Sequence, residues 1–333
     1  MKPPCSLPPR LIAPRWPPGW TASPTLPQHS NSDTLPRITV VTPSYNQAAF
    51  LETTIRSVLE QGYPALDYHV IDGGSTDGSV EILEHYGPWL ASWVSERDGG
   101  QVDAILKGLS RAEGEWFNWI NSDDLLAPSA LWEVARARDV DMYAGCTHNF
   151  WQDVLAQRRI SRNITARGLV RQQLGSRAIW HQPGIWFRTA ALREVGIDRS
   201  LHYRFDFDLI IRYARLFPRV QYSDSTLAWF RKHADSKTVS QADRFHAEHV
   251  RILQRLIADP QAGALNADAR QGLAALQWRQ DLRALEQDEG RSRLNRLLAI
   301  VLAASHAPCG GQMKFIYKAL RGVVRGNNRV LHQ

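Results

Sequence analysis

The sequence predicts an α/β fold, in which a mostly parallel sheet carries helices on both faces and a helical extension follows. The first observation is a strand, loop and helix order that repeats between residues 37 and 125. The second is that each strand is a short continuous apolar run, as expected for strands that are buried on both faces. The third is the helical composition of residues 241–287, where Pro260 and Gly263 are the only turn signals.

Four strands and three helices are expected in the first half of the folded region. Each strand ends in a polar, glycine-rich or acidic loop. Because parallel strands have their carboxyl ends at one edge of a sheet, the four loops should gather there. The expected strands are residues 38–41, 68–71, 89–94 and 116–120, and the expected helices are residues 50–61, 79–86 and 101–111.

The pattern is less regular between residues 126 and 240, which we assign to a second half of the same domain. An apolar stretch at residues 178–187 is interrupted there by the tetrapeptide His-Gln-Pro-Gly. The elements expected in this half are a helix at residues 131–137, strands at residues 142–150, 154–160 and 220–230, and a helix that begins near Asp206.

The first 36 residues are expected to form a poorly ordered arm. Ten of the eighteen prolines of the chain lie there, and a proline-rich segment favours an extended chain over a helix. The arm has no apolar run of seven or more residues, so it does not match a secretory signal. We therefore divide the chain into an arm at residues 1–36, a domain at 37–240 with halves at 37–125 and 126–240, and a helical extension at 241–333.

The positive charge of the chain lies at its two ends. Residues 1–36 carry three Lys/Arg and one Asp, and residues 291–333 carry eight Lys/Arg and no acid, which leaves 29 basic and 32 acidic residues between them. A nucleic-acid partner is not expected, because phosphate binding requires a basic face on the folded body. Cys5, Cys146 and Cys309 lie too far apart for a zinc cluster or a disulfide framework, which fits a reducing cytoplasm.

The C-terminal segment combines an apolar patch at residues 294–304 with a final helix that has one apolar and one basic face. The basic side chains recur at helical spacing and are Lys314, Lys318, Arg321 and Arg325. The patch is shorter than the ~20 residues that span a bilayer, so one interpretation is a helix that lies on the anionic inner leaflet of a membrane. A helix packed on the protein, with its basic face in solvent, explains the same pattern.

Two adjacent carboxylates, Asp123 and Asp124, follow the fourth expected strand. Open α/β sheets place their ligands at this edge. Carboxylates there suit a hard cation, Mg²⁺ or Mn²⁺, which would hold the diphosphate of a nucleotide. The alternative is that the two acids cap the helix that follows.

The first two strand-end loops would bring together an aromatic ring, an amide and a carboxylate. Tyr45 could cover a planar base, and Asp72 could accept the imide proton of uracil. Alternatively, Asp72 stabilises the Asp-Gly turn that it begins.

In their order and spacing, these blocks resemble family 2 glycosyltransferases of the GT-A fold, and most closely the bacterial branch that builds O-antigen and exopolysaccharide. The blocks are Thr-Pro-Ser-Tyr-Asn, Asp-Gly-Gly-Ser-Thr-Asp-Gly, Ser-Glu-Arg-Asp-Gly-Gly and Gly-Glu-Trp-Phe-Asn-Trp-Ile-Asn-Ser-Asp-Asp, within a match over about residues 37–235. The resemblance implies a Rossmann-like sheet with a nucleotide-sugar half at residues 37–125 and an acceptor half at 126–240. The residues that it assigns to the nucleotide-sugar are Thr42, Pro43, Tyr45, Asn46, Asp72, Asn121 and Ser122.

The resemblance also implies a metal ligand. Asp123 takes the third position of the family's Asp-x-Asp element, whose first position is Asn121 in this chain, and Asp124 is the alternative ligand. Arg231-Lys232-His233 is similar to a block in which a basic residue or a histidine approaches the diphosphate. His233 is therefore a candidate for an additional ligand, although a lone surface histidine needs no such role.

Two further blocks carry the acceptor side and the base. His181 and Gln182 match an acceptor-side block, and Asp206 stands where inverting members have their base. One carboxylate must remove the proton of the acceptor hydroxyl as the new bond forms. Otherwise Asp206 is an acid in the first turn of a helix, where its charge is stabilising, and Asp208 is expected to pair with Arg212.

The sequence therefore predicts a metal-dependent, inverting glycosyltransferase. It would move a sugar from a nucleotide-sugar, expected to be a UDP-sugar, to a saccharide or lipid-linked acceptor in cell-surface polysaccharide synthesis. The alternative is a catalytically silent nucleotide-binding or assembly subunit at the membrane, which Asn121, Leu106 and the basic tail motivate. A dehydrogenase is excluded, because no Gly-x-Gly-x-x-Gly joins a strand to a helix.

Overall fold

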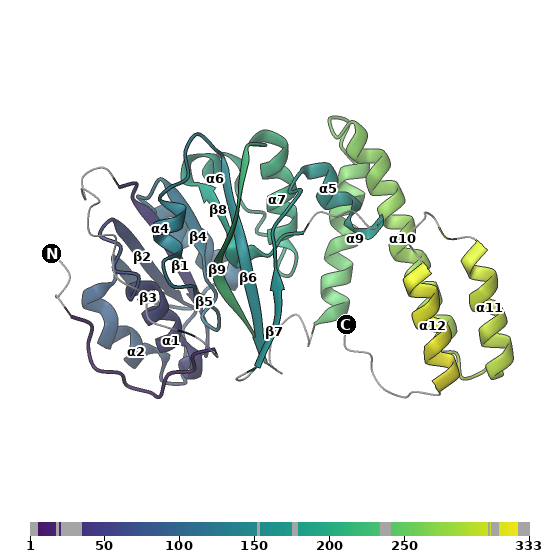
Figure 1. Cartoon of the computed structure of the whole chain (residues 1–333), viewed down its shortest axis with the longest axis horizontal. Coiled ribbons are helices and arrows are strands. Elements are labelled where there is room, and N and C mark those ends of the chain that lie inside the picture. The colour runs from purple at the N-terminus through teal and green to yellow at the C-terminus, as the bar shows by residue number, and fades with distance from the viewer. Residues whose placement is uncertain are drawn as a thin grey trace. The chain divides into compact units, whose positions relative to one another are not determined.

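The computed structural model describes residues 6–17, 20, 35–151, 154–174, 179–233, 241–305, 307 and 313–325. The chain forms two compact units (Figure 1), the first of residues 1–164 and 179–236 and the second of residues 165–178 and 237–333. The longer part of the second unit begins at residue 237, close to the expected boundary at residue 241. The assignment of residues 165–178 differs from the expectation, because this segment packs with the second unit although it lies within the first in the sequence.

The strands that the structure describes form one sheet in the first unit. The strand order is β3-β2-β1-β4-β8-β6-β9-β5, and β7 pairs with β6. From β3 to β4 all neighbours are parallel, as expected for the nucleotide-sugar half. Beyond β4 the sheet is mixed, because β8 is antiparallel to both of its neighbours while β6 and β9 are parallel. The strands are β1 (Ile38–Ser44), β2 (Leu66–Asp72), β3 (Ser92–Ser95), β4 (Trp116–Trp119), β5 (Leu125–Leu126), β6 (Met142–Trp151), β7 (Val154–Arg159), β8 (Ile185–Arg188) and β9 (Val220–Lys232).

Helices cover both faces of the parallel part of the sheet, as the sequence predicts. Ile38 and Val40 of β1 lie in one buried cluster with side chains of α1 and α2. Val41 points to the opposite face, where a Cβ on Gly108 of α3 would come within 2.5 Å of it. The helices of the first unit are α1 (Ala48–Leu59), α2 (Ser79–Tyr86), α3 (Gln101–Arg111), α4 (Ala130–Val134), α6 (Thr189–Val195) and α7 (Phe205–Leu216).

Two strand boundaries differ by three residues from the expected ones, and the others differ by two residues or fewer. β1 continues to Ser44, so Thr42 and Pro43 are buried strand residues and not part of a loop. β3 begins only at Ser92, because residues 87–89 form a 3₁₀ turn that contains a proline. The first change shortens the loop that follows β1, and the second affects only the segment that precedes β3.

Residues 6–17 of the N-terminal arm lie along the first unit, so the expectation of a poorly ordered arm is wrong for this stretch. The chain forms neither a helix nor a strand there, in keeping with its prolines. Its backbone groups nevertheless have partners in the domain, since the N–H groups of Leu11 and Ile12 donate to the Glu52 carboxylate at 2.7 Å each. Proline content predicts the absence of a helix, whereas order depends on such partners. Residues 1–5, 18–19 and 21–34 of the expected arm lie outside the described residues.

The second unit consists of helices (Figure 1). Its main apolar cluster joins Trp278 and Leu282, Ile300, and a face of the final helix formed by Ile316, Ala319 and Val323. That face is therefore buried in protein, as in the packed interpretation of the final helix. No helix within the described ranges has the length and hydropathy that crossing a membrane requires. The helices are α5 (Ala166–Val170), α9 (Ala242–Ala258), α10 (Ala264–Gln287), α11 (Arg293–Ser305) and α12 (Met313–Arg325).

Candidate active site

The turn that carries Asp123 and Asp124 follows β4 directly and is fixed by α1. The backbone N–H of Asp124 donates to the carbonyl of Asn121 at 3.0 Å. The hydroxyl of Thr54, in α1, contacts the carbonyls of Ser122 and Asp124 at 2.9 and 2.7 Å. Ser122 is itself buried. The turn is thus held by its backbone, which leaves the two carboxylates to take different directions.

Asp123 and Asp124 have different environments. Asp124 is fully buried and accepts hydrogen bonds from the backbone N–H of Arg231 at 3.0 Å and the side-chain amide of Asn121 at 3.2 Å. Burial and the neighbouring Asp123 carboxylate raise the pKa of Asp124 well above its usual range. The side chain of Asp123 keeps 23% of its surface exposed. Asp123 is therefore the carboxylate that an external ligand can reach, and Asp124 is an internal acceptor.

His233 lies next to Asp123. Its Nε2 is 2.9 Å from the Asp123 Oδ2, and its ring is 5.1 Å from the ring of Phe50. The two-residue strand β5 brings them together, because it follows the turn and pairs with the end of β9. A carboxylate oxygen beside an imidazole nitrogen fits a divalent cation. Among the residues that the structure describes, no cluster of three or more His, Cys, Asp or Glu surrounds one point, so phosphate oxygens would have to complete the coordination.

Arg231 faces the protein at this site. It is 5% exposed, and its Nε donates to the carbonyl of Asp123 at 2.9 Å. Its guanidinium lies over the rings of Phe50 and Phe150, at 4.9 and 4.5 Å from their centroids. Buried between two rings, Arg231 supports the backbone of the turn that carries Asp123.

Asn121 uses both ends of its amide. Its Oδ1 accepts from Nε2 of Gln101 at 2.6 Å, and its Nδ2 donates to Asp124. An aspartate here would add a third carboxylate beside Asp124 and could not donate to it. This accounts for an amide at the first position of the Asp-x-Asp element. Gln101, at the start of α3, was not identified from the sequence, since nothing in its helix pattern distinguishes it.

Asp72 organises the turn after β2. It is fully buried, and its Oδ2 accepts from the N–H groups of Gly74 and Ser75 at 3.1 and 2.8 Å and from the Ser95 hydroxyl at 2.7 Å. Its Oδ1 accepts from the Ser75 hydroxyl at 2.5 Å. These contacts agree with the interpretation of Asp72 as a residue that stabilises the turn. Recognition of a base by Asp72 stays a prediction.

Tyr45 is the exposed aromatic residue of this edge. It is 62% exposed, and a Cβ on Gly73 would come within 3.4 Å of its ring and 3.2 Å of the Asp98 Oδ1. The absence of a side chain at Gly73 therefore allows the ring and the Asp98 carboxylate to lie close to the backbone of this turn. Asp98 was part of a motif in the sequence but was not identified as a site residue.

Three further residues that were predicted to bind the nucleotide-sugar make contacts within the protein. Asn46 joins the two loops, because its Oδ1 accepts from the N–H of Thr76 at 2.9 Å and its φ of 51° places it in the left-handed region. Thr42 is buried and its hydroxyl lies 2.9 Å from that of Tyr68. Pro43 is buried beside it in β1. These residues set the shape of the loops that carry Tyr45 and Asp72.

Asp206 lies in the first turn of α7, as predicted. Its Oδ1 accepts from the backbone N–H of Phe207 at 2.8 Å. The preceding residue, Phe205, packs on Trp119 of β4, with 5.8 Å between ring centroids. The start of α7 is thereby fixed beside the end of β4. The expected pair of Asp208 and Arg212 is also present, at 2.7 Å.

His181 and Gln182 lie just before β8. The Nε2 of Gln182 donates to Oδ1 of Asn118 at 3.0 Å and to the carbonyl of Trp119 at 2.9 Å, so Gln182 ties this segment to β4. The Nδ1 of His181 is 2.8 Å from the Thr147 hydroxyl. Burial, with Arg159 and Lys232 nearby, lowers the pKa of His181 to about 3, so it is neutral at physiological pH.

The part of the chain that carries most of this site matches a known protein family. Residues 39–199 match the model of glycosyl transferase family 2. An uncharacterized glycosyltransferase of Mycobacterium tuberculosis is 29% identical over 183 residues, which are 54% of this chain and 69% of the relative. The chain therefore contains a domain at residues 39–199 that is similar to glycosyltransferase family 2, and this similarity supports an activity as a glycosyltransferase.

Solved structures show the same fold. TarS 1–349 of S. aureus, in complex with UDP, aligns with a TM-score of 0.57 and 18% identity over 87% of this chain and 88% of that one. Mannosyltransferase PcManGT of Pyrobaculum calidifontis, in complex with GDP-Man and Mn²⁺, aligns with a TM-score of 0.54 and 17% identity over 96% of this chain and 92% of that one. At these identities the likeness concerns the GT-A fold alone.

Proposed function

We propose that this glycosyltransferase is metal-dependent and inverting, and that it moves one sugar from a UDP-sugar to a saccharide or lipid-linked acceptor in cell-surface polysaccharide synthesis. The observation that carries the proposal is the pairing of the part-exposed Asp123 carboxylate with His233 at the sheet edge that also holds Tyr45. The UDP in TarS and the Mn²⁺ in PcManGT support a nucleotide donor and a cation for a protein of this fold.

Asp123 and His233 are the residues that would hold Mn²⁺ or Mg²⁺. When bound, the cation would stabilise the charge on the departing diphosphate. Asp124 is proposed as a support for the turn and not as the ligand, because its oxygens already accept from Arg231 and Asn121. Tyr45 would cover the base, and Asp72 would shape the loop that receives it.

Asp206 is the proposed catalytic base. It would accept the proton of the acceptor hydroxyl while the acceptor oxygen bonds to the anomeric carbon. The bond from that carbon to the diphosphate oxygen breaks at the same time, and the nucleoside diphosphate leaves with the electron pair. A single displacement of this kind inverts the anomeric configuration. The position at a helix start favours the charged form of Asp206 that can act as a base.

A donor panel tests the proposal. UDP-sugars and GDP-sugars are incubated with Mn²⁺, with Mg²⁺ or with EDTA, with a saccharide acceptor and without one, and released nucleotide is measured. We expect release to require a cation, and Asp206→Asn to lower transfer by about 10²-fold or more while UDP still binds. The exposed residue Glu194 of α6 provides the control Glu194→Gln, with unchanged turnover. Full turnover in EDTA, or by Asp206→Asn, would contradict the mechanism.

A further inference from the structure

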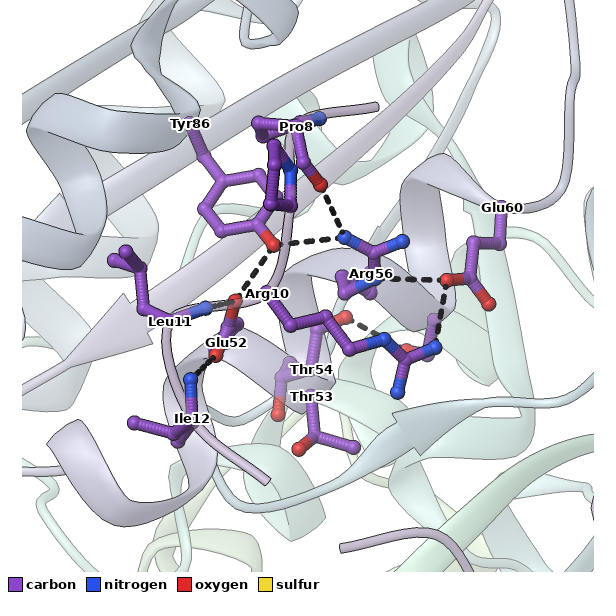
Figure 2. Close-up of polar contacts among 12 residues, drawn as sticks. Pro8, Arg10, Leu11, Ile12, Glu52, Thr53, Thr54, Arg56, Glu60 and Tyr86 are labelled. Atoms are coloured by element: carbon purple, nitrogen blue, oxygen red, sulfur yellow. Dashed lines mark hydrogen bonds and ion pairs between the residues drawn. The ribbon is translucent and has the colours of Figure 1, made fainter. Parts of the chain in front are cut away.

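A buried carboxylate on α1 anchors the N-terminal arm (Figure 2). Glu52 is 1% exposed, and both of its oxygens are bonded, one to the N–H of Leu11 and the other to the N–H of Ile12. The hydroxyl of Tyr86 also donates to it, at 2.7 Å. A carboxylate that is removed from water needs such charge-assisted bonds, and two of the three come from the arm.

Further contacts hold the arm before this point. Arg56 donates to the carbonyl of Pro8 at 2.9 Å, and the indole N–H of Trp89 donates to the carbonyl of Ser6 at 3.1 Å. The side chain of Arg10 pairs with Glu60 at 3.4 Å, more loosely than the backbone contacts. The arm is therefore fixed mainly through its backbone, which suits an extended, proline-rich segment.

The arm then continues to the candidate metal site. The carbonyl of Arg15 accepts from Nη2 of Arg231 at 2.7 Å, and the Arg15 guanidinium lies 5.2 Å from the centroid of Phe50. Trp16 stacks on Trp20 at 4.5 Å, and both pack against the small apolar cluster of Leu125, Ala127, Phe150 and Trp229. Within this cluster, Leu125 and Ala127 follow the Asp123 turn in the sequence, Phe150 belongs to β6, and Trp229 lies near the end of β9.

One guanidinium therefore bonds both the arm and the metal-binding turn. The Nε of Arg231 donates to the carbonyl of Asp123, and its Nη2 donates to the carbonyl of Arg15. Because the guanidinium is planar and rigid, fixing one nitrogen fixes the direction of the other. The arm thus constrains the group that holds the backbone of Asp123.

We propose that the N-terminal arm is a positioning element of the donor site. Glu52 fastens the arm to α1, and the arm, through Arg231, holds the Asp123 turn in the geometry that binds the cation. The part that concerns the cation rests on the proposed function, whereas the positioning of the turn does not.

The first experiment measures cation affinity. Mn²⁺ binding in the presence of UDP is followed by electron paramagnetic resonance in the full chain, in a chain lacking residues 1–20, and in Glu52→Gln. The glutamine offers one acceptor where the arm presents two N–H donors, while in the shortened chain Glu52 returns to solvent. We expect Mn²⁺ affinity to fall about tenfold or more in both, as for other groups that orient metal ligands, and KM for Mn²⁺ to rise with little change in kcat. Glu84→Gln, at an exposed glutamate of α2, should behave as the full chain.

The second experiment separates the arm from the metal. Hydrogen exchange of metal-free protein is measured in peptides that cover residues 121–126 and 229–233. Exchange should be faster in the shortened chain and in Glu52→Gln, and unchanged in Glu84→Gln. Absence of Mn²⁺ binding in the full chain would contradict the proposed function but not this result. Unchanged exchange in both variants would overturn the positioning role whether or not the metal binds.

A double-mutant cycle tests the route through Arg231. If the arm acts through this guanidinium, Arg231→Lys should accelerate exchange in the same peptides, and removal of residues 1–20 should add little to it. Equal and additive effects would show that the arm acts elsewhere and would overturn the proposed route.

Discussion

At the scale of single residues, Asp123 and Asp124 are adjacent but have opposite environments. Asp123→Ala should abolish Mn²⁺ binding and change the free energy of unfolding by less than about 1 kcal/mol, because a part-exposed pair with His233 contributes little. Asp124→Ala should lower that free energy by about 1–3 kcal/mol, because the buried N–H of Arg231 loses its acceptor. Calorimetric Mn²⁺ titration and urea unfolding measure the two effects. Loss of Mn²⁺ binding in Asp124→Ala with full stability would reverse the assignment.

His181 gives the protein a sensitivity to acid. Its pKa is about 3 in the folded chain and rises to the usual ~6.5 on unfolding, so between these values the unfolded chain binds a proton that the folded chain does not. Stability should therefore fall as the pH falls, by about 2 kcal/mol between pH 7 and pH 5 from this residue. Urea unfolding at both pH values should show a smaller loss in His181→Gln. His202→Gln, at an exposed histidine, should retain the loss of the unmodified chain, and an equal loss in His181→Gln would contradict a buried neutral His181.

At the scale of elements, the strands and helices that are long enough to show an apolar run or a helical period in the sequence were predictable. The apolar runs of β1, β2 and β4 and the amphipathic helices α1 and α3 lie where the sequence places them. β5 has two residues and α5 has five, too few to show a period. The binding of the arm to Glu52 could not be predicted, because nothing in the amphipathic pattern of α1 distinguishes this glutamate from a solvent-exposed one. For the site, the motif located Asp123, but its partnership with His233 depends on the pairing of β5 with β9, a contact that local patterns do not contain.

The exposed apolar side chains of the C-terminal segment that bear on the membrane hypothesis lie on α11, whereas α12 buries an apolar face in protein. The apolar face of α12 is buried, whereas Leu294, Leu298 and Val301 of α11 are 65%, 54% and 55% exposed at helical spacing. With no acid among residues 291–333, an exposed apolar face here would suit an anionic leaflet, and we propose α11 as the helix that would contact it.

A pair of substitutions distinguishes the two helices. Leu298→Glu should weaken co-sedimentation with anionic liposomes. The melting temperature should stay unchanged, because the Leu298 side chain is exposed and is not part of the buried cluster of the second unit. Ile316→Ala should lower the free energy of unfolding by about 2–4 kcal/mol, because it removes buried methyl groups from the cluster of the second unit. Neutral liposomes are the control. Equal sedimentation of Leu298→Glu and the unmodified chain would show that α11 is not the contact.

At the scale of the whole molecule, the order of the chain and the division into units do not coincide. Residues 165–178 are inserted between parts of the first unit but pack within the second. Leu169 and Val170 are fully buried there, and Arg167 pairs with the buried Asp268 of α10 at 2.6 Å. The helices that the sequence presents as an appendage therefore cover a segment that interrupts the glycosyltransferase domain.

A chain that ends at residue 236 should consequently lose the helices that bury the segment of residues 165–174. Leu169 and Val170 would be exposed, at about 1.5–3 kcal/mol of lost burial each, so we expect self-association and binding of a hydrophobic dye. Leu169→Ser with Val170→Ser in the shortened chain should abolish this self-association, whereas a chain that ends at residue 325 should behave as the full chain. UDP should still bind to this shortened double variant, because Tyr45, Asp72 and Asn121 all lie in the first unit. Gel filtration and calorimetry measure these outcomes, and a monomeric, dye-free chain ending at residue 236 would show that the inserted segment does not depend on the helices of the second unit.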